Sequence, residues 1–422
     1  MNTLKELLRK LVLVVITAEA KAAIRNYRRQ IVVVTGSVGK TSSKDAVYAS
    51  MSKNFFVRRS EKGYNSDVGV PLTILGVPNG WSNPVQWIKN IFEGLTLILL
   101  NAPYPRWLIL EIGADRPGDI TKSLSWLDPD VVVATRFPDI SVHVEYYDSP
   151  ADVNREELAP VSWLRDGGIY VYNADDEQAS KVQVPQGVKR VGFGFSKNAD
   201  VKGTRFHISS KDHAPTGIAF GVQYENQKAS VSLPGVVGAT HAYAVLSGLA
   251  TGAILGVPLE ESSQAFSSHE PPRGRARLIE GVKGSTIIDD TYNASPIATE
   301  EALLTLRDIP RLGKRVAILA DMLELGSYSV AEHKRIGAIA AQSADILITA
   351  GIRARNIADG AREAGMPDAS IKECERGADA ASHALTIVEA GDAVLIKGSQ
   401  SMRMERVVKS LMKEPERAGE LL

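Results

Sequence analysis

The sequence predicts an α/β protein with two domains, each built around a mostly parallel sheet. Short β-branched runs alternate with helical patterns over residues 31–172 and again over residues 285–396. This alternation is typical of a doubly wound sheet, in which helices connect parallel strands. The segment Pro271-Pro272-Arg273-Gly274 separates the two series, and its prolines and glycine predict a linker.

The length of the chain agrees with this division. Its 422 residues suffice for more than one hydrophobic core, because single cores seldom grow past roughly 250 residues. We therefore expect an N-terminal helical extension over residues 1–28, a central domain over residues 29–272 and a C-terminal domain over residues 273–422.

The N-terminal extension predicts a basic amphipathic helix over residues 3–28. Its apolar run from Leu11 to Ile16 is shorter than the ~20 residues that a membrane span requires, and lysine and arginine flank the run on both sides. The sequence leaves two hypotheses open. The helix packs on the protein's own body, or it lies on an anionic membrane surface.

The central domain is expected to begin with a strand, a loop and a helix that starts near Thr41. Polar and apolar residues alternate over residues 201–233, which favours antiparallel strands, and a helix is expected over residues 240–256. The other elements expected here are strands at residues 31–35, 107–112, 130–135 and 168–172, and a helix around residues 119–127.

The C-terminal domain predicts a second, Rossmann-like α/β series. Its expected strands cover residues 285–289, 315–319, 345–349 and 392–396. Helices are expected near residues 297–307, 330–342, 355–364 and 376–389.

A long apolar insertion lies between Trp81 and Trp107. Its apolar residues recur partly at helical spacing, which predicts a helical hairpin packed with the N-terminal helix. A second hypothesis is that residues 1–28 and 81–107 together form a peripheral membrane contact or a homodimer face.

Composition excludes several classes of protein. Lysine plus arginine and aspartate plus glutamate both number 49, so the formal charge is zero and gives no general case for a nucleic-acid partner. The single cysteine, Cys374, excludes an internal disulfide framework and a cysteine-rich zinc site. This cysteine usage suits a reducing cytoplasm.

The loop after the first strand predicts a nucleoside triphosphate site. Residues 35–42 read TGSVGKTS and follow an apolar β-branched strand. Glycines allow backbone N–H groups to approach phosphate oxygens, a helix N-terminus attracts them, and a lysine supplies a fixed charge. Val34 stands where the full motif has its first glycine. The candidate phosphate-binding residues are Gly36, Ser37, Gly39, Lys40, Thr41 and Ser42.

Polar residues follow several of the expected strands. Glu111, Asp290 and Lys397 each stand at the carboxyl end of one strand. Because ligands of open α/β sheets bind at that edge, these residues are candidates for the same site. A helix cap for Glu111, a turn for Asp290 and a solvated side chain for Lys397 are the structural alternatives.

Six motifs in this order resemble those of the Mur ligase family over roughly residues 29–415, and most closely those of the branch that adds D-alanyl-D-alanine. In addition to TGSVGKTS, they are NSDVGVPL (65–72), EIGA (111–114), DDTYNASP (289–296), DMLELG (321–326) and KGSQSMRME (397–405).

The resemblance implies a central P-loop ATPase domain and ATP-driven amide bond formation. In this family a substrate carboxylate takes the γ-phosphoryl group of ATP, and an amine then displaces phosphate from the acyl phosphate. Cations stabilise the charge on the phosphoryl oxygens in such reactions. The implied cofactors are ATP and Mg²⁺, and the implied partner is a small-molecule or peptide cell-wall precursor.

The resemblance also implies roles for individual residues. Lys40 would hold the β- and γ-phosphates and Thr41 one Mg²⁺, while Glu111 and His143 would bind a second Mg²⁺. An exposed strand histidine is the structural alternative for His143. The remaining implied roles are contact with the γ-phosphate by Arg275, with the nucleoside by Asp290 and Asn293, and with the acyl phosphate by Lys397.

Several positions depart from the family pattern. Arg155 stands where these ligases commonly carry a carbamylated lysine, and arginine cannot take that modification. We therefore expect that Glu156 or Glu157 substitutes, or that the second metal is bound differently. The usual His-Asn-x-x-Asn helix start appears as THAYA at residues 240–244, and Gln400 and Ala320 replace an arginine and a glycine.

The branch that the chain resembles has an N-terminal uridine-binding domain, whereas only about 28 residues precede the phosphate loop here. The sequence therefore leaves alternatives to a ligase that adds D-alanyl-D-alanine. One is a Mur-like ligase for another carboxylate, such as in poly-γ-glutamate synthesis. The other is a nucleotide-binding regulatory protein that has lost turnover, a hypothesis that Arg155 and Thr240 favour.

Overall fold

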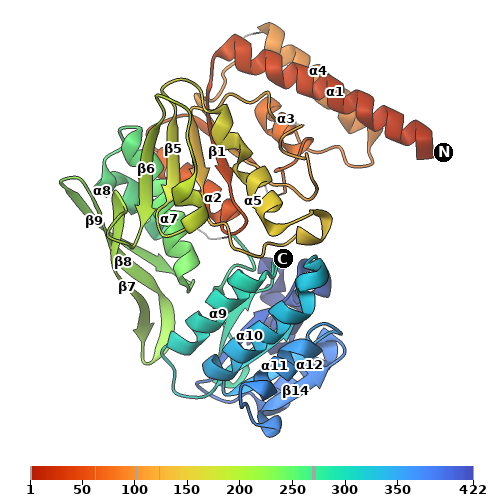
Figure 1. Ribbon diagram of the computed structural model, residues 1–422, viewed down its shortest axis with the longest axis vertical. Coiled ribbons are helices and arrows are strands. Elements are labelled where there is room, and N and C mark those ends of the chain that lie inside the picture. Colours follow the sequence, from red (N-terminus) through yellow and green to blue (C-terminus); the bar gives the residue numbers. More distant parts are fainter. Residues whose placement is uncertain (1, 62, 101, 123, 269–271, 422) are drawn as a thin grey trace.

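The computed structural model describes residues 2–61, 63–100, 102–122, 124–268 and 272–421. Two sheets lie at different levels of the molecule, with helices against both of their faces (Figure 1). The linker expected at Pro271 to Gly274 lies partly outside the described residues.

The first sheet has nine strands in the order β2-β3-β1-β4-β5-β6-β7-β8-β9. In this spatial order, neighbouring strands from β2 through β1 to β7 pair in parallel. Strands β7, β8 and β9 form an antiparallel extension. The strands are β1 (Gln30–Thr35), β2 (Val57–Arg59), β3 (Trp107–Glu111), β4 (Val131–Ala134), β5 (Ile169–Asn173), β6 (Lys189–Gly194), β7 (Val201–Lys211), β8 (Ala214–Tyr224) and β9 (Gln227–Pro234).

Helices cover both faces of this sheet, so its central strands are apolar on both sides. In β1, Ile31 and Val33 enter one core, whereas Val32 and Val34 enter the other. Apart from α4, which is described below, the helices that follow the first strand in this part of the chain are α2 (Lys40–Met51), α3 (Gly69–Leu75), α5 (Pro150–Leu158), α6 (Glu177–Lys181), α7 (Ala239–Ile254) and α8 (Leu259–Gln264).

The second sheet has the order β10-β11-β15-β12-β13-β14, and only the edge strand β10 is antiparallel. Its strands are β10 (Arg277–Glu280), β11 (Thr286–Asp290), β12 (Arg315–Ala320), β13 (Ile346–Ala350), β14 (Ile371–Cys374) and β15 (Ala393–Lys397). Its helices are α9 (Pro296–Asp308), α10 (Ser329–Ser343), α11 (Arg355–Glu363), α12 (Gly377–Ile387) and α13 (Glu405–Leu411).

The strands expected in both series are confirmed, as are the antiparallel segment and the helix after it. The helix expected around residues 119–127 is wrong, because the described residues there form turns. Glu156 explains part of this difference. Its carboxylate accepts hydrogen bonds from the backbone N–H groups of Ile120 and Thr121, both at 2.9 Å, so a distant side chain holds this backbone in a turn.

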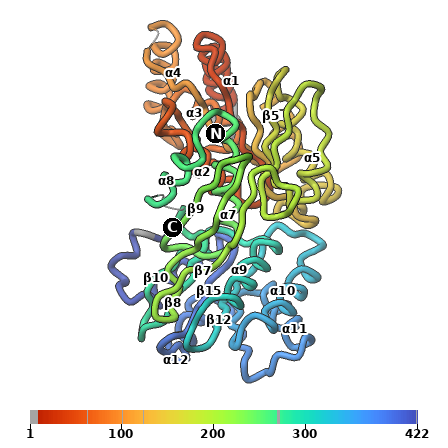
Figure 2. The backbone as a smooth tube through the Cα atoms, turned by 90° about the vertical axis from the view of Figure 1, so that its left-hand side faces the viewer, coloured from red at the N-terminus to blue at the C-terminus, as the bar shows by residue number. Residues whose placement is uncertain are grey.

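Two long helices, α1 (Asn2–Tyr27) and α4 (Pro84–Leu100), lie side by side at the end of the molecule away from the second sheet (Figure 2). Tyr27 Oη donates a hydrogen bond of 2.8 Å to the Leu97 carbonyl, which joins their C-terminal ends. The expected packing of the N-terminal helix on the protein's own body is confirmed. The segment 81–107 packs with the N-terminal helix as expected, but the hairpin is wrong, because the described residues of this segment form the single helix α4. No helix among the described residues has the length and apolarity to cross a bilayer.

A buried carboxylate lies between these two helices. Glu19 is 6% exposed, and neither of its side-chain oxygens has a hydrogen-bond partner among the described residues. Its Oε2 occupies the space beside Gly94, where a Cβ would approach this oxygen to 2.3 Å. Burial raises the pKa of Glu19 to about 7.

We expect Glu19→Gln to flatten the dependence of stability on pH. Because the pKa of Glu19 is higher in the folded state than in the unfolded state, its contribution to stability is complete below pH ~4.5 and is lost as pH rises towards 7. The variant should therefore exceed the wild type by roughly 1–2 kcal/mol at pH 8, with a smaller difference at pH 5. Urea unfolding at both pH values measures this. Glu93→Gln, at an exposed position of α4, is the control, and an unchanged pH profile in Glu19→Gln would contradict the prediction.

Candidate active site

The loop between β1 and α2 has the backbone of a phosphate-binding loop. Gly36 has a φ of 132°, and a Cβ at this position would lie 2.1 Å from Thr135 Oγ1. Gly39 has a φ of 86° and precedes α2, whose N-terminus has no side-chain cap. The Ser37 N–H donates to the Arg136 carbonyl at 2.8 Å and ties the loop to the end of β4. The first amides of α2 are therefore available to an anion.

Two of the residues predicted to bind metal meet beside this loop. Thr41 Oγ1 donates a hydrogen bond of 3.0 Å to Glu111 Oε1. Ser60 Oγ accepts from the Glu111 N–H at 3.2 Å and fixes the end of β3. Glu111 Oε2 lies 3.6 Å from the ammonium of Lys44, a buried cation of α2 that the sequence analysis did not select.

The Lys40 ammonium points to a carboxylate of α5. Its Nζ lies 2.9 Å from Glu157 Oε1, and the side chain of Glu157 is 4% exposed. Ser37 Oγ donates to the second oxygen of the same carboxylate, and Thr35 Oγ1 donates to the Glu157 carbonyl. Glu157 therefore contacts three residues of the segment 35–40.

Three adjacent residues of α5, namely Arg155, Glu156 and Glu157, point in different directions. Arg155 is 76% exposed and pairs with Asp152, so it points into solvent. Glu156 directs its carboxylate to Ile120 and Thr121 and holds the turn described above. Among the alternatives left open by the sequence, Glu157 is the carboxylate at the phosphate loop.

His143 lies apart from the Thr41–Glu111 contact. Its Nδ1 is 2.6 Å from Glu324 Oε2, and its Nε2 is 3.6 Å from Asp115 Oδ1. Glu324 follows β12 of the second sheet, so this contact joins the two parts of the chain. The described residues contain no group of three or more His, Cys, Asp or Glu side chains arranged to hold a metal ion.

The three residues predicted at the carboxyl edge of the second sheet lie together. Lys397 Nζ donates to Asp290 Oδ2 at 2.5 Å and to the Asn293 carbonyl at 3.0 Å. The other oxygen of Asp290 accepts from the Ala276 N–H at 3.2 Å. Burial lowers the pKa of Lys397, and the adjacent Asp290 carboxylate opposes this shift.

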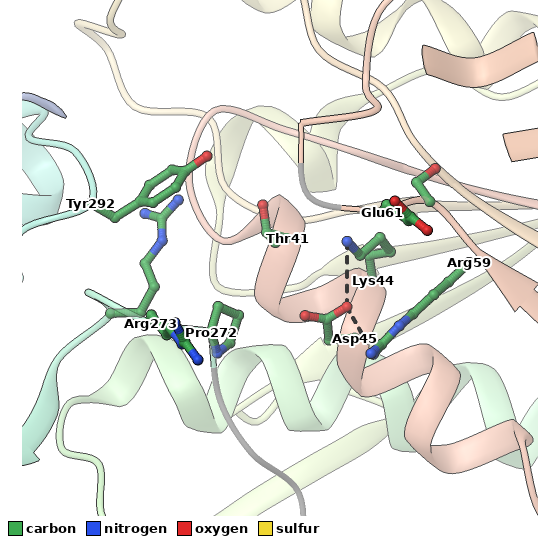
Figure 3. A pocket seen from close by; sticks show the side chains of 10 residues that line it. Thr41, Lys44, Asp45, Arg59, Glu61, Pro272, Arg273 and Tyr292 are labelled. Atoms are coloured by element: carbon green, nitrogen blue, oxygen red, sulfur yellow. Dashed lines mark ion pairs between the residues drawn. The ribbon is translucent and has the colours of Figure 1, made fainter. Parts of the chain in front are cut away.

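A cavity of roughly 390 Å³ lies between the phosphate-loop helix and the linker (Figure 3). Figure 3 shows Thr41 and Lys44 on one side and Arg273 and Tyr292 on the other. Arg275 also lines this cavity, with its guanidinium 4.1 Å from the centre of the Tyr292 ring. The cavity therefore has walls from both parts of the chain.

The helix start that departs from the family pattern lies near the other side of the phosphate loop. Thr240 Oγ1 donates to Glu301 Oε2 at 2.7 Å, and Tyr243 Oη donates to Asp175 Oδ2 at 2.8 Å. Thr240 and Tyr243 line a small cavity together with Gly39. The hydroxyl groups of Thr240 and Tyr243 are therefore each hydrogen-bonded to a carboxylate.

The residues at the loop fit a magnesium–nucleotide complex chemically. Hydroxyl and carboxylate oxygens such as those of Thr41 and Glu111 are the donors that Mg²⁺ takes. Glycine is required at position 36, because any side chain there would collide with Thr135 and displace the loop. The role of His143 as a metal ligand stays a prediction, because its ring contacts Glu324 and Asp115 and not Thr41 or Glu111.

Comparisons with known proteins agree with this arrangement. Residues 92–250 match the Mur ligase middle domain, and residues 274–400 match the Mur ligase glutamate ligase domain. The chain is 26% identical over 398 residues to the UDP-N-acetylmuramoyl-tripeptide--D-alanyl-D-alanine ligase of Bacillus subtilis (strain 168), which covers 94% of this chain and 79% of that protein. The ligase of the same name from Escherichia coli (strain K12) is 27% identical over 90% of this chain and 76% of its own length.

A solved structure shows the same fold. The MurF ligase of Thermotoga maritima in complex with ADP superposes with a TM-score of 0.76 over 96% of this chain and 84% of that chain, at 23% identity. Both family matches and these relatives converge on one assignment, and the chain belongs to the Mur ligase family.

Proposed function

We propose that this protein is an ATP-dependent, ADP-forming ligase of the MurF type, which joins D-alanyl-D-alanine or a similar amine to the carboxylate of a cell-wall peptide precursor. The observation that carries the proposal is the match to ligases of this name along 94% of the chain. The phosphate loop and the cavity between the two parts of the chain support it. We place this reaction in the cytoplasm.

The proposed chemistry has two steps. An oxygen of the substrate carboxylate attacks the γ-phosphorus of ATP, which forms an acyl phosphate and releases ADP. The amine then attacks the acyl carbon, the amide bond forms, and phosphate leaves. Charge on the transferred phosphoryl oxygens has to be neutralised by fixed cations in a site with little water.

The phosphate loop would bind the nucleotide in this reaction. We assign phosphate contacts to the backbone of Gly36, Ser37 and Gly39 and to Ser42, and the β- and γ-phosphates to Lys40. Lys40 must leave Glu157 to reach them, since its ammonium now lies 2.9 Å from that carboxylate.

Thr41 would hold one Mg²⁺, and Glu111 and His143 remain our proposed ligands of a second. When bound, the ion withdraws negative charge from the phosphoryl oxygens. These residues therefore would place the triphosphate between α2 and the end of β3.

The linker side would close over the γ-phosphate. Arg275 lines the cavity opposite Thr41, which supports its proposed contact with the γ-phosphate. Asp290 and Asn293 would contact the nucleoside, and Lys397 would face the acyl phosphate. The short contact between Lys397 and Asp290 has to open for that role, because the Lys397 side chain is 2% exposed.

The decisive experiment measures ATP-dependent phosphate release with Mg²⁺ and UDP-N-acetylmuramoyl-tripeptide, with and without D-alanyl-D-alanine. We expect release to require the dipeptide and the product to gain its mass in mass spectrometry. Release with other carboxylate donors only would overturn the donor assignment. Tight ATP binding without release under any of these conditions would favour a regulatory protein.

A further inference from the structure

Helix α4 exposes a continuous apolar stripe. Val85, Ile88, Phe92, Leu95 and Leu99 follow one another at intervals of three and four residues, which places them on one helical face. They are between 42% and 75% exposed. The opposite side of α4 enters the core through partly buried residues such as Trp87 and Ile91. The stripe is therefore not used by the protein's own core.

Helix α1, which packs beside α4, also carries an exposed apolar stripe. Leu11 and Val14 are 59% and 65% exposed, and Ala18 continues the same spacing. Ile16 and Ala20, on the other side of the helix, are fully buried. We call the exposed apolar residues of the two helices and their flanks the α1–α4 face: Leu11, Val14, Trp81, Val85, Ile88, Phe92, Leu95, Leu99 and Leu100.

Exposed apolar side chains elsewhere are few and lie on separate elements, such as Leu312 and Ile352. Single residues of this kind are ordinary on protein surfaces, whereas a contiguous patch of them marks an interaction site. The α1–α4 face is therefore the part of the described surface that needs a partner.

Charge indicates which partner fits. On the described side chains of α1 and α4, the exposed cations are Arg9, Lys10, Arg25 and Lys89, and the single exposed acid, Glu93, lies 3.5 Å from Lys89. By helical spacing, Lys10 flanks the α1 stripe and Arg25 continues it, so both ammonium and guanidinium groups can extend beside a partner.

We propose that the α1–α4 face docks on an anionic lipid surface, with the two helices lying in the headgroup region. A two-fold contact between copies would bring these cations against each other, whereas anionic headgroups would neutralise them. Trp81, 80% exposed at the start of the stripe, has the side chain that favours the boundary between headgroups and water.

The position of the face fits this role. Both views place α1 and α4 at the end of the molecule opposite the helices of the second sheet (Figures 1 and 2). The cavity at the phosphate loop is lined by α2 and the linker, so docking leaves it accessible. The contact is independent of the proposed ligase activity, and Lys40→Ala protein should bind lipid as the wild type does.

Vesicle flotation of the full chain tests the proposal. We expect binding to vesicles of phosphatidylglycerol and phosphatidylcholine, and at least tenfold weaker binding to pure phosphatidylcholine or in 0.5 M salt. Phe92→Asp and Leu99→Asp should each lower the partition coefficient by about tenfold or more. Ile352→Asp, at a residue that is 78% exposed on the second domain, is the matched control and should bind unchanged.

Two further measurements separate the alternatives. The double variant Lys10→Glu, Arg25→Glu should bind anionic vesicles more weakly than the wild type. Lipid should shift the tryptophan fluorescence of the wild type to the blue, and Trp81→Phe should lack this shift. Equal partition of Phe92→Asp and wild type would overturn the proposal. A dimer in light scattering that Phe92→Asp dissociates, without vesicle binding, would overturn it in favour of a second copy.

Discussion

Lys40→Ala is expected to lower the rate of ATP-dependent phosphate release by at least ~10³-fold. The Lys40 ammonium is the cation that the phosphate loop carries at the N-terminus of α2, and alanine cannot place a positive charge on the β- and γ-phosphates. Backbone amides of the loop remain in the variant, so the loss should appear mainly in kcat, with a smaller effect on the affinity for ADP.

The control for this variant is Lys53→Ala. Lys53 is exposed just beyond the C-terminal end of the same helix and has no part in the proposed site. Both variants should give the circular dichroism spectrum of the wild type, because α2 is anchored through buried residues such as Val47 and Met51. Full activity of Lys40→Ala would disprove the assignment of the phosphate loop.

Much of the fold is predictable because its signals are local. Buried parallel strands such as β1 consist of uninterrupted β-branched residues, and the glycines of the phosphate loop have positive φ angles that favour glycine. Strand β2 lacks such a local signal and was not predicted, since its three residues, Val57–Arg59, include two arginines and form no apolar run.

Two features could not be predicted from local sequence signals: the turn where a helix was expected at residues 119–127, and the choice between Glu156 and Glu157. The turn at residues 119–122 depends on Glu156, which is distant in sequence. The choice between Arg155, Glu156 and Glu157 depends on the rotation of α5. Successive helical residues are ~100° apart, so the side chain that faces the loop is fixed by how the helix packs. The contact of His143 with Glu324 likewise requires the relative position of the two domains, which no motif encodes.

The second large effect is expected for Glu157→Gln. In the structure the carboxylate neutralises Lys40, and its side chain is 4% exposed. Once Lys40 turns to a triphosphate, the buried Glu157 carboxylate would lose its cation and remain beside another anion, at a cost of several kcal/mol. A divalent cation held by Glu157 would offset that cost. We therefore propose that Glu157 supplies the metal contact for which Arg155 is unsuited.

This proposal predicts opposite effects of Glu157→Gln on two measurements. The variant should need at least tenfold more Mg²⁺ for half-maximal activity and should lose ~100-fold in kcat, because glutamine keeps the shape of the side chain but not its charge. Without Mg²⁺ it should bind ADP more tightly than the wild type, since Lys40 is then free of its ion pair. Isothermal titration with and without Mg²⁺ measures the second effect separately from turnover.

Glu156→Gln is the matched comparison because the two glutamates are adjacent and both buried. Its carboxylate accepts two backbone N–H groups with one oxygen, so the loss of charge should lower the melting temperature and leave the Mg²⁺ dependence unchanged. If Glu157→Gln instead lowers stability only, with wild-type Mg²⁺ dependence, then Glu157 holds the loop and does not bind metal. In that case the ion pair with Lys40 is a structural contact that the nucleotide simply replaces.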